Sequence, residues 1–346
     1  MNPLTIIWLQ FFLCSALIGS AGYALTRYAD AIAQRTGLTG SWIGMTLLAI
    51  VTSLPELATG ITSVTVAQAP NLAVGDALGS CVINLFFLVV IDLFFRKGPL
   101  WRKASQGHVL AGAFGVVLLG FVLISLLISQ VKISPGATLV PVPASAQWGF
   151  GWITPIVLGL YLVAMRTVFA YERDHGVPID ERAGEDLPAL RDAVLRFALA
   201  ALVVAGAGIW LPFVATDLAQ AMAWNKSFVG SLFVAMATSL PELAVTVSAL
   251  RLGALDMAIG NLLGSNLFNV VIIALDDLFY RPGVLLSSVS PVHAVTAGSA
   301  ITMTGLAMVG LFFRPESRVL RAVGWVSLGL MALYLLNTSV LYLYGE

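Results

Sequence analysis

The sequence predicts an all-α integral membrane protein with ten transmembrane helices, arranged as two inverted-topology repeats of five helices each. Three observations lead to this fold class. Hydrophobic residues make up 59% of the 346 positions and charged residues only 10%, whereas a soluble domain carries about 25% charged residues. Apolar runs of about twenty residues, the length that crosses a bilayer, recur along the chain. Finally, several short motifs occur twice, half a chain apart.

Loop signals divide the chain into the ten candidate helices. A Pro/Gly/Ser-rich stretch, SPGATLVPVPASAQ, separates the fourth from the fifth, and the most charged stretch, YERDHGVPIDERAGEDLPALRD, separates the fifth from the sixth. These signals predict a first inverted repeat over 1–170, a cytoplasmic linker over 171–194 and a second inverted repeat over 195–346, together forming one domain. The predicted spans are roughly 4–26, 40–69, 72–95, 107–130, 148–170, 195–215, 225–250, 256–280, 291–313 and 320–344.

The distribution of basic residues predicts the orientation of the chain. With ten spans and the N-terminus outside, fifteen of the eighteen Lys and Arg residues fall in inner loops, and the outer side holds only Lys132, Lys226 and Arg281. Cytoplasmic loops carry the excess of Lys and Arg. We therefore expect a plasma (inner) membrane protein with both termini on the outer side.

The two halves of the chain are copies of one another. The motif TSLPELA occurs at 52–58 and again at 238–244. AVGDALGSCVINL at 73–85 matches AIGNLLGSNLFNV at 258–270, and DLFFR at 92–96 matches DLFYR at 277–281. The offset of 185 or 186 residues corresponds to five spans, an odd number, so the copies enter the membrane from opposite sides. Inverted repeats of this kind are typical of secondary transporters, with the site near the midplane between the halves.

Each copy of the first motif places a proline inside an apolar run. Proline has no N–H, and its ring clashes with the carbonyl four residues back. Pro55 therefore frees the carbonyl of Val51 and loosens that of Thr52, and Pro241 does the same in the second copy. A freed carbonyl is costly in hydrocarbon unless it lines a cavity or binds a cation.

A glutamate follows each of these prolines. Placing Glu56 or Glu242 at mid-membrane costs at least ~3 kcal/mol, and such residues usually mark an ion or proton path. Polar residues one or two turns away share the same helix faces, namely Thr52, Thr59 and Ser63 in the first copy and Ser239 and Thr246 in the second. The partner helices carry a hydroxyl and an amide one turn apart, at Ser80 with Asn84 and at Ser265 with Asn269.

The oxygen atoms in these two motifs favour a hard divalent cation. The Glu56 and Glu242 carboxylates, the Thr52 and Thr238 carbonyls, and the side chains of two asparagines, Asn84 and Asn269, supply eight oxygens. Calcium takes about six to eight oxygen ligands in flexible geometry. One divalent ion, two protons or monovalent cations could each neutralise the two glutamates, and mutual exclusion at one site is the basis of exchange.

Other functional classes lack support in the sequence. A net charge of zero gives no basic face for nucleic acid. The two cysteines, Cys14 and Cys81, lie in apolar runs and suggest neither a disulfide framework nor a zinc site. No nucleophile–base arrangement indicates an enzyme, and we expect no cofactor. The expected partners are inorganic cations and the lipid bilayer, and the chain is expected to be monomeric. A cation channel using the same acidic site is a less favoured alternative.

The duplicated TSLPE and GSxxxN blocks resemble the alpha-repeats of the calcium/cation antiporter superfamily, which includes the sodium/calcium exchangers and their proton-coupled relatives. The resemblance covers about 55 residues in each half. It implies alternating access, with the first and sixth helices sliding past a core that holds the ions. It also implies exchange of Ca²⁺ for Na⁺, or alternatively for H⁺. By position, the binding residues that it implies are Ala49, Thr52, Ser53, Glu56, Ser80, Asn84, Ala235, Thr238, Ser239, Glu242, Ser265 and Asn269.

The two copies differ at several polar positions. Asp76 stands where the second copy has Asn261, one turn before Ser80, and we consider it a possible proton site. Cys81 stands where the second copy has Asn266. Three aspartates near helix ends are expected at the membrane interface, and two mirrored histidines near helix ends are expected to have interfacial or packing roles; these residues are Asp92, Asp276, Asp277, His108 and His293.

Purely structural roles are the alternatives for the candidate site. The two glutamates could form a buried hydrogen bond between helices, and the two asparagines could join helices in the same way. Ser80 and Ser265, each preceded by a glycine, could serve close helix packing as readily as ion binding.

Overall fold

The protein is described by a computed structural model over residues 3–36, 39–95, 100–129, 150–175, 188–224, 228–315, 318–319 and 323–344. Within these ranges, nine helical segments are long and apolar enough to cross a membrane, and a bent helix pair makes a tenth. The predicted loop SPGATLVPVPASAQ and residues 176–187 of the predicted linker lie outside the described ranges.

The helices follow one another in the predicted order, with π-helical (η1, η2) and 3₁₀-helical (η3) segments among them. The first half contains α1 (Pro3–Thr36), α2 (Gly40–Ile43), η1 (Gly44–Leu48), α3 (Ala49–Thr52), α4 (Leu54–Thr65), α5 (Pro70–Phe94), α6 (Leu100–Lys103), α7 (Gly107–Ser129) and α9 (Ile153–His175). The second half contains α10 (Leu190–Met222), η2 (Val229–Val234), α12 (Ala235–Thr238), α13 (Leu240–Arg251), α14 (Leu255–Phe279), η3 (Leu285–Ser287), α15 (His293–Phe313) and α16 (Trp325–Tyr344). A two-stranded antiparallel pair, β1 (Arg318–Val319) with β2 (Val323–Gly324), precedes α16.

Two helices are longer than the sequence predicts. The predicted span 4–26 is part of the 34-residue helix α1, and the predicted span 195–215 is part of the 33-residue helix α10. At 1.5 Å per residue each helix is about 50 Å long, well beyond the ~30 Å hydrocarbon core. The charges that mark the edge of a span do not end a helix, because the backbone hydrogen bonds continue in the polar region.

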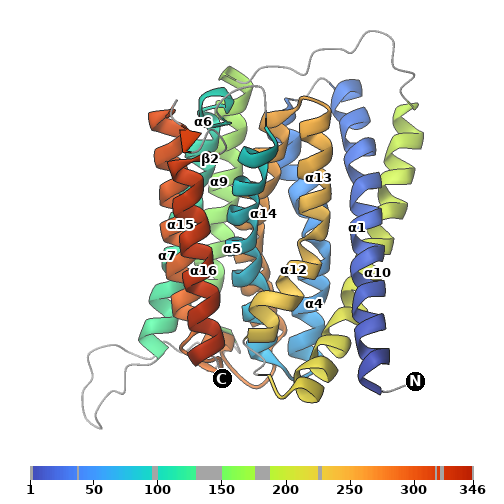
Figure 1. Ribbon diagram of the computed structural model, residues 1–346, viewed down its shortest axis with the longest axis vertical. Helices are drawn as coiled ribbons and strands as arrows, with labels where there is room; N and C mark the ends of the chain where they lie inside the picture. The colour runs from blue at the N-terminus through green and yellow to red at the C-terminus, as the bar shows by residue number, and fades with distance from the viewer. Residues whose placement is uncertain are drawn as a thin grey trace.

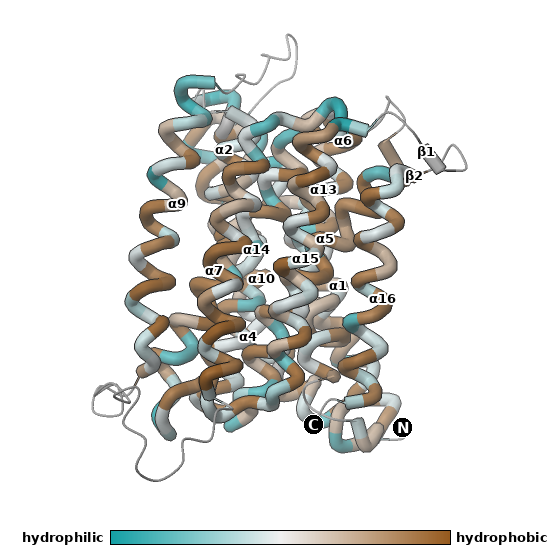
Figure 2. Tube along the Cα trace, turned by 90° about the vertical axis from the view of Figure 1, so that its left-hand side faces the viewer, coloured by the Kyte–Doolittle hydropathy of each residue, from teal (hydrophilic) through white to brown (hydrophobic). Residues whose placement is uncertain are grey.

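Both chain termini lie at the same end of the bundle (Figure 1). An even number of membrane crossings requires this arrangement, so it agrees with ten spans. Figure 2 shows that the outer helices α7, α9 and α16 carry hydrophobic residues along most of their length, with hydrophilic residues gathered mainly near the ends. Large exposed side chains such as Leu162, Leu202 and Leu335 supply the apolar outer surface that a bilayer would cover.

Helices α5 and α14 form the centre of the bundle. In their most apolar windows 78% and 89% of residues are buried, against 22% in α1 and 28% in α9. Glycines allow very close approach here: a Cβ on Gly79 of α5 would lie 2.6 Å from the Ser231 carbonyl oxygen of η2, and Gly264 of α14 packs in the same way on Met45 of η1. Each central helix therefore packs directly on the opposite half of the chain.

The long helices α1 and α10 lie side by side, and each packs on the proline-containing helix of the opposite half, α1 on α13 and α10 on α4 (Figure 1). Gly22 of α1 meets Pro241 of α13, and a Cβ there would lie 2.6 Å from the proline Cα. Gly208 of α10 meets Pro55 of α4 in the mirrored contact, at 2.7 Å. Thr59 of α4 also donates a hydrogen bond to the Gly208 carbonyl, 3.0 Å away. Each long helix thus contacts the proline kink of the other half.

The aspartates Asp92 and Asp277 lie two residues before the ends of α5 and α14 and are buried inside the protein, and their position at the membrane interface stays a prediction. Asp277 accepts hydrogen bonds from Gly151 N at 2.5 Å, Thr154 Oγ1 at 2.6 Å and Leu285 N at 2.7 Å. The sequence-equivalent Asp92 accepts from the backbone N–H of Gly324 and the hydroxyl of Ser327. Each carboxylate satisfies donors at the start of another segment, which compensates for its burial.

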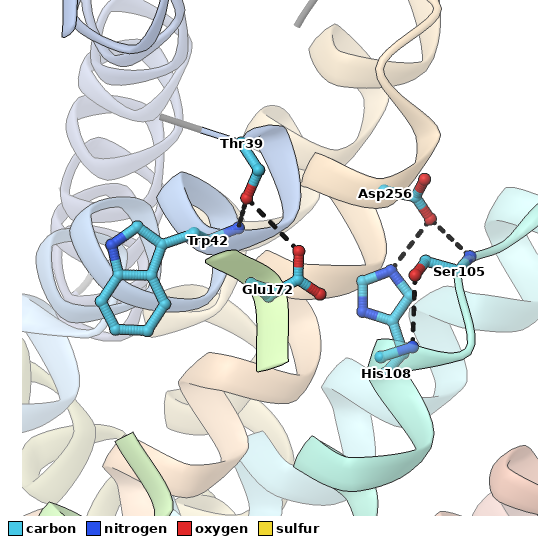
Figure 3. A network of polar contacts seen from close by, with 7 residues as sticks. Thr39, Trp42, Ser105, His108, Glu172 and Asp256 are labelled. Carbon is cyan, nitrogen blue, oxygen red and sulfur yellow. Dashed lines mark hydrogen bonds and ion pairs between the residues drawn. The ribbon is translucent and has the colours of Figure 1, made fainter. Parts of the chain in front are cut away.

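The two mirrored histidines are fully buried and connect helix starts, in agreement with the predicted packing role. His108 Nε2 lies 3.0 Å from Asp256 Oδ1, which also accepts from Ser105 N at 2.7 Å (Figure 3). In the other half, His293 Nε2 and Ser290 N contact Asn71 Oδ1 in the same geometry. The acceptor in the first turn of the central helix is therefore Asp256 in α14 and Asn71 in α5.

Replacing Gly208 by alanine should destabilise the protein, because the new methyl group collides with the backbone of Pro55. We expect a loss of about 1–3 kcal/mol, the usual cost of overpacking a close contact. Gly206 lies half a turn away on the same helix and has open space around it. Gly206→Ala should therefore be neutral or slightly stabilising. Thermal unfolding of both variants in detergent measures the difference, and equal melting temperatures would contradict the close α10–α4 contact.

Replacing Asp256 by alanine should destabilise the start of α14, because His108 Nε2 and Ser105 N lose their shared acceptor. Leaving buried donors unpaired costs about 1–3 kcal/mol. Asp256→Asn is the matched control, and it should be tolerated because Asn71 accepts the same two bonds in the other half. Thermal melts of the two variants in detergent provide the comparison. A melting temperature as low for Asp256→Asn as for Asp256→Ala would show that the charge, not the acceptor, matters.

Candidate functional site

Each broken helix is interrupted at a serine immediately before the Leu-Pro-Glu sequence. Ser53 has φ −86° and ψ 11°, and Ser239 has φ −80° and ψ 6°, so neither is helical. Prolines 55 and 241 then occupy the second position of α4 and α13, where the absence of an N–H is tolerated. The two segments of the second copy meet at an angle of 43°. The breaks expose the first turns of α4 and α13 to the bundle interior.

The two glutamates lie in these first turns, and each accepts hydrogen bonds from two serine side chains in the same symmetric pattern. Glu56 Oε1 accepts hydrogen bonds from Ser80 at 3.3 Å and from Ser239 at 3.2 Å. Glu242 Oε1 accepts from Ser265 at 3.3 Å and from Ser53 at 3.2 Å. Each carboxylate therefore contacts one serine from its own half and one serine from the other half.

The second carboxylate oxygens of the glutamates are buried and free. Glu56 is 1% exposed and Glu242 is 0% exposed. Within the described ranges, neither Oε2 atom has a hydrogen-bond partner, and neither glutamate forms a salt bridge. Buried charges are normally paired or coordinate a metal. The arrangement thus offers two acceptor oxygens and negative charge to a cation.

The threonines of the motif contact the two positions at which the copies differ. Thr52 Oγ1 donates to Asn261 Oδ1 at 3.2 Å and lies 3.4 Å from Ser265 Oγ. Thr238 Oγ1 donates to Asp76 Oδ1 at 2.9 Å. Asp76 is buried, and its Oδ2 has no partner among the described residues. A third carboxylate therefore lies beside one end of the glutamate pair.

The two asparagines lie in the centre of the bundle, as the repeat predicts. Asn84 Nδ2 donates to Asn266 Oδ1 at 3.1 Å, and Asn266 Nδ2 donates to the Cys81 carbonyl at 3.1 Å. Asn84 Oδ1 is buried without a donor in the described part of the chain, as is Asn269 Oδ1. The Asn84 and Asn266 amides thus join α5 to α14, whereas neither polar side-chain atom of Asn269 has a hydrogen-bond partner within the described ranges.

The remaining candidate residues have several roles. Ala49 and Ala235 are fully buried, and their carbonyls accept from the backbone N–H groups of Ser53 and Ser239 at 3.1 and 3.0 Å. Ser80 and Ser265 combine the two roles weighed from the sequence, since each bonds a glutamate and follows a closely packed glycine. The predicted common face is wrong for Thr59, which points to α10.

Sequence reasoning did not include Asn261 and Asn266 in the site. Both are buried and bond to predicted site residues, Thr52 and Asn84. Their signal was their position in the repeat, opposite Asp76 and Cys81. The contacts themselves depend on how α5 and α14 cross, which the sequence does not contain.

A helical membrane bundle built from two inverted repeats, with buried carboxylates where the repeats meet, defines a secondary transporter of cations. The family model described as "Sodium/calcium exchanger protein" matches residues 6–168 and 193–340. The chain therefore belongs to the sodium/calcium exchanger family, which is a family of membrane antiporters and not of enzymes. This confirms the family suggested by the duplicated motifs.

Curated relatives and solved structures agree with this assignment. The chain is 29% identical over 260 residues to the inner membrane protein YrbG of Escherichia coli, covering 74% of each chain. It is 26% identical over 277 residues to the sodium/calcium exchanger MaX1 of Methanosarcina acetivorans, covering 73% of this chain and 77% of the relative. The solved sodium-calcium exchanger NCX_Mj shares the fold, with a TM-score of 0.64 and 21% identity over 97% of this chain and 99% of that chain.

Proposed function

We propose that the protein exchanges Ca²⁺, or a similar divalent cation, for Na⁺ by alternating access at the two-glutamate site. The observation that carries this proposal is the pair of buried carboxylates, each bound to serines of both halves and each with a free Oε2. A site shared between two inverted halves can be opened to either side by moving one part of the bundle against the other.

The proposed ligand set contains the acidic, amide, hydroxyl and carbonyl oxygens that the two motifs bring together. The glutamate carboxylates would provide charge, and the Asn84 and Asn269 amide oxygens would provide neutral ligands. Hard oxygen donors suit Ca²⁺, whose coordination is flexible. The other proposed ligands are hydroxyl or carbonyl groups of Ala49, Thr52, Ser53, Ser80, Ala235, Thr238, Ser239 and Ser265.

Proton coupling is the second candidate function, and Asp76 supports it. This aspartate is buried, accepts a hydrogen bond from Thr238 and retains a free Oδ2. Three carboxylates exceed the charge of one divalent ion, so one of them could take a proton while the ion is bound. In this alternative, H⁺ replaces Na⁺ as the counter-ion, and Asp76 is the proposed proton site.

The proposed setting is a plasma (inner) membrane, with both termini on the outer side and the linker between α9 and α10 in the cytoplasm. The excess of basic residues in the loops on one side supports this orientation. We propose a monomer as the transport unit, because both halves of the site come from one chain.

Ion flux into proteoliposomes separates the possible coupling ions. We expect an imposed Na⁺ gradient, at equal pH on both sides, to drive Ca²⁺ uptake, because Na⁺ and Ca²⁺ compete for the same carboxylates. A pH gradient without Na⁺ is the matched condition. Uptake driven only by the pH gradient would establish the proton-coupled alternative, and flux that ignores both gradients would indicate a channel.

Replacing Glu56 or Glu242 by glutamine should abolish high-affinity divalent binding while the protein remains folded. Glutamine keeps the side-chain shape and the acceptor for the serine pair, but it removes the charge that attracts the cation. Isothermal titration with Ca²⁺ in detergent measures the loss, which we expect to exceed a hundredfold, or roughly 2.7 kcal/mol. Asp174→Asn, which changes an exposed aspartate, is the control. Binding retained in both glutamine variants would refute the site.

A further inference from the structure

Asp276 is a buried aspartate that the two-glutamate site does not use. It lies near the end of α14 and has no exposed surface. Neither carboxylate oxygen has a hydrogen-bond partner within the described ranges. The sequence predicts an interfacial position from its place near the helix end, and in the structure α4 covers the side chain. Its neighbour Asp277, by contrast, receives three hydrogen bonds.

The Asp276 carboxylate packs on the backbone of Gly60 in α4. A Cβ built on Gly60 would overlap both of its oxygens. Gly60 lies one turn after Glu56 on the same helix, so Asp276 sits beside the broken helix on one side of the glutamates. Along α14, Asp276 is seven residues beyond Asn269, or about 10 Å. In the proposed orientation, this is the outer side of the site.

The other half of the protein lacks this arrangement. At the repeat offset of 185, Asp276 corresponds to Ile91, and at the offset of 186 Gly60 corresponds to Thr246. An isoleucine and a threonine need no glycine-sized gap and carry no charge. The aspartate and the glycine therefore occur together on only one side of the site. The fold that both halves share does not require this pair, because the other half folds in the same way without it.

An ionised carboxylate cannot remain in this position without compensation. In a dry interior, an unpaired charge costs so much that the group neutralises instead. A metal ion would need several oxygens around it, and the contact with Gly60 leaves no room on the α4 side. A proton needs neither space nor further ligands.

We propose that Asp276 is a proton-binding site, and that its protonation allows α4 to stay packed against α14 on the outer side of the two-glutamate site. Loss of the proton leaves a charge against the Gly60 backbone, which is relieved when α4 moves away and water enters. Protonation therefore favours the closed outer side, and deprotonation favours its opening. The effect on exchange rests on the proposed antiport function, whereas proton binding by Asp276 does not.

The titratable groups around Asp276 are acidic or are engaged elsewhere. Asp76 on α5 and Asp277 on α14 are the acidic side chains that face it. On α4, the nearest acidic group is Glu56, one turn before Gly60. On α15, His293 contacts α5 beside Gly75 and bonds Asn71, so it is engaged elsewhere. No basic side chain of the described residues pairs with Asp276.

Infrared difference spectroscopy, in which the spectrum of each purified full-length variant is subtracted from that of the wild type, tests proton binding directly. A protonated carboxylic acid has its own carbonyl band, and we expect the Asp276→Asn variant to lose one such band at neutral pH. Asp256→Asn, on the same helix, should keep the band, because Asp256 accepts hydrogen bonds as a carboxylate and does not contribute a protonated-acid band. Gly60→Ala keeps the acid but displaces it, so the band should shift. A spectrum unchanged in both Asp276→Asn and Gly60→Ala would overturn the proposal.

The opening of the outer side is tested by Ca²⁺/Ca²⁺ exchange in proteoliposomes at saturating Ca²⁺. Saturation removes competition between protons and Ca²⁺ at the glutamates, so the remaining pH dependence reports on the movement. The wild-type maximal rate should rise with pH, by at most about tenfold per pH unit for one proton. The Asp276→Asn rate should be low and independent of pH. A wild-type pH profile in that variant would overturn the opening mechanism, and absence of exchange in every protein would instead contradict the proposed antiport.

Discussion

The structure depends on placing two carboxylates in the low-dielectric centre of a membrane bundle. Such charges are tolerated only when other groups balance them. Here each glutamate receives one serine hydroxyl from its own half and one from the opposite half. The remaining oxygens have no partner in the described part of the chain. In the proposed function a cation completes the balance, so the ion site would be a property of the folded protein and not of any single helix.

The crossed bonds also explain why the two halves interlock. Ser53 and Ser239 can reach the opposite glutamates only because the broken helices pass close to each other at the centre. That approach requires glycines at the helix contacts, as at Gly79 and Gly264. It also requires α1 and α10 to pack on the proline kinks from outside. Movement of these long helices would therefore act on both halves of the site together.

Duplication provides a symmetric scaffold, and a few substitutions make it directional. Asp76 and Asn261 occupy equivalent positions and accept hydrogen bonds from equivalent threonines, but only one of them carries charge. Asp276 adds a further acidic group on the same side, where its counterpart is an isoleucine. Opening towards the two sides of the membrane therefore has different electrostatic consequences, although the backbone is nearly the same. An exchanger that works between unlike compartments can use such a difference.

The sequence by itself determined the ten spans, the duplication and the two Pro-Glu motifs, because hydrophobic length, repeat spacing and the chemistry of proline are local properties. It also determined the family, which depends on the same motifs. Only the tertiary structure decided which hydroxyl meets which carboxylate, that Thr59 faces α10, and that Asn261 and Asn266 join the site. It also decided that Asp92, Asp276 and Asp277 are buried inside the bundle, which their positions near helix ends do not reveal. These outcomes depend on how helices from opposite halves cross, and distance along the chain carries no information about that.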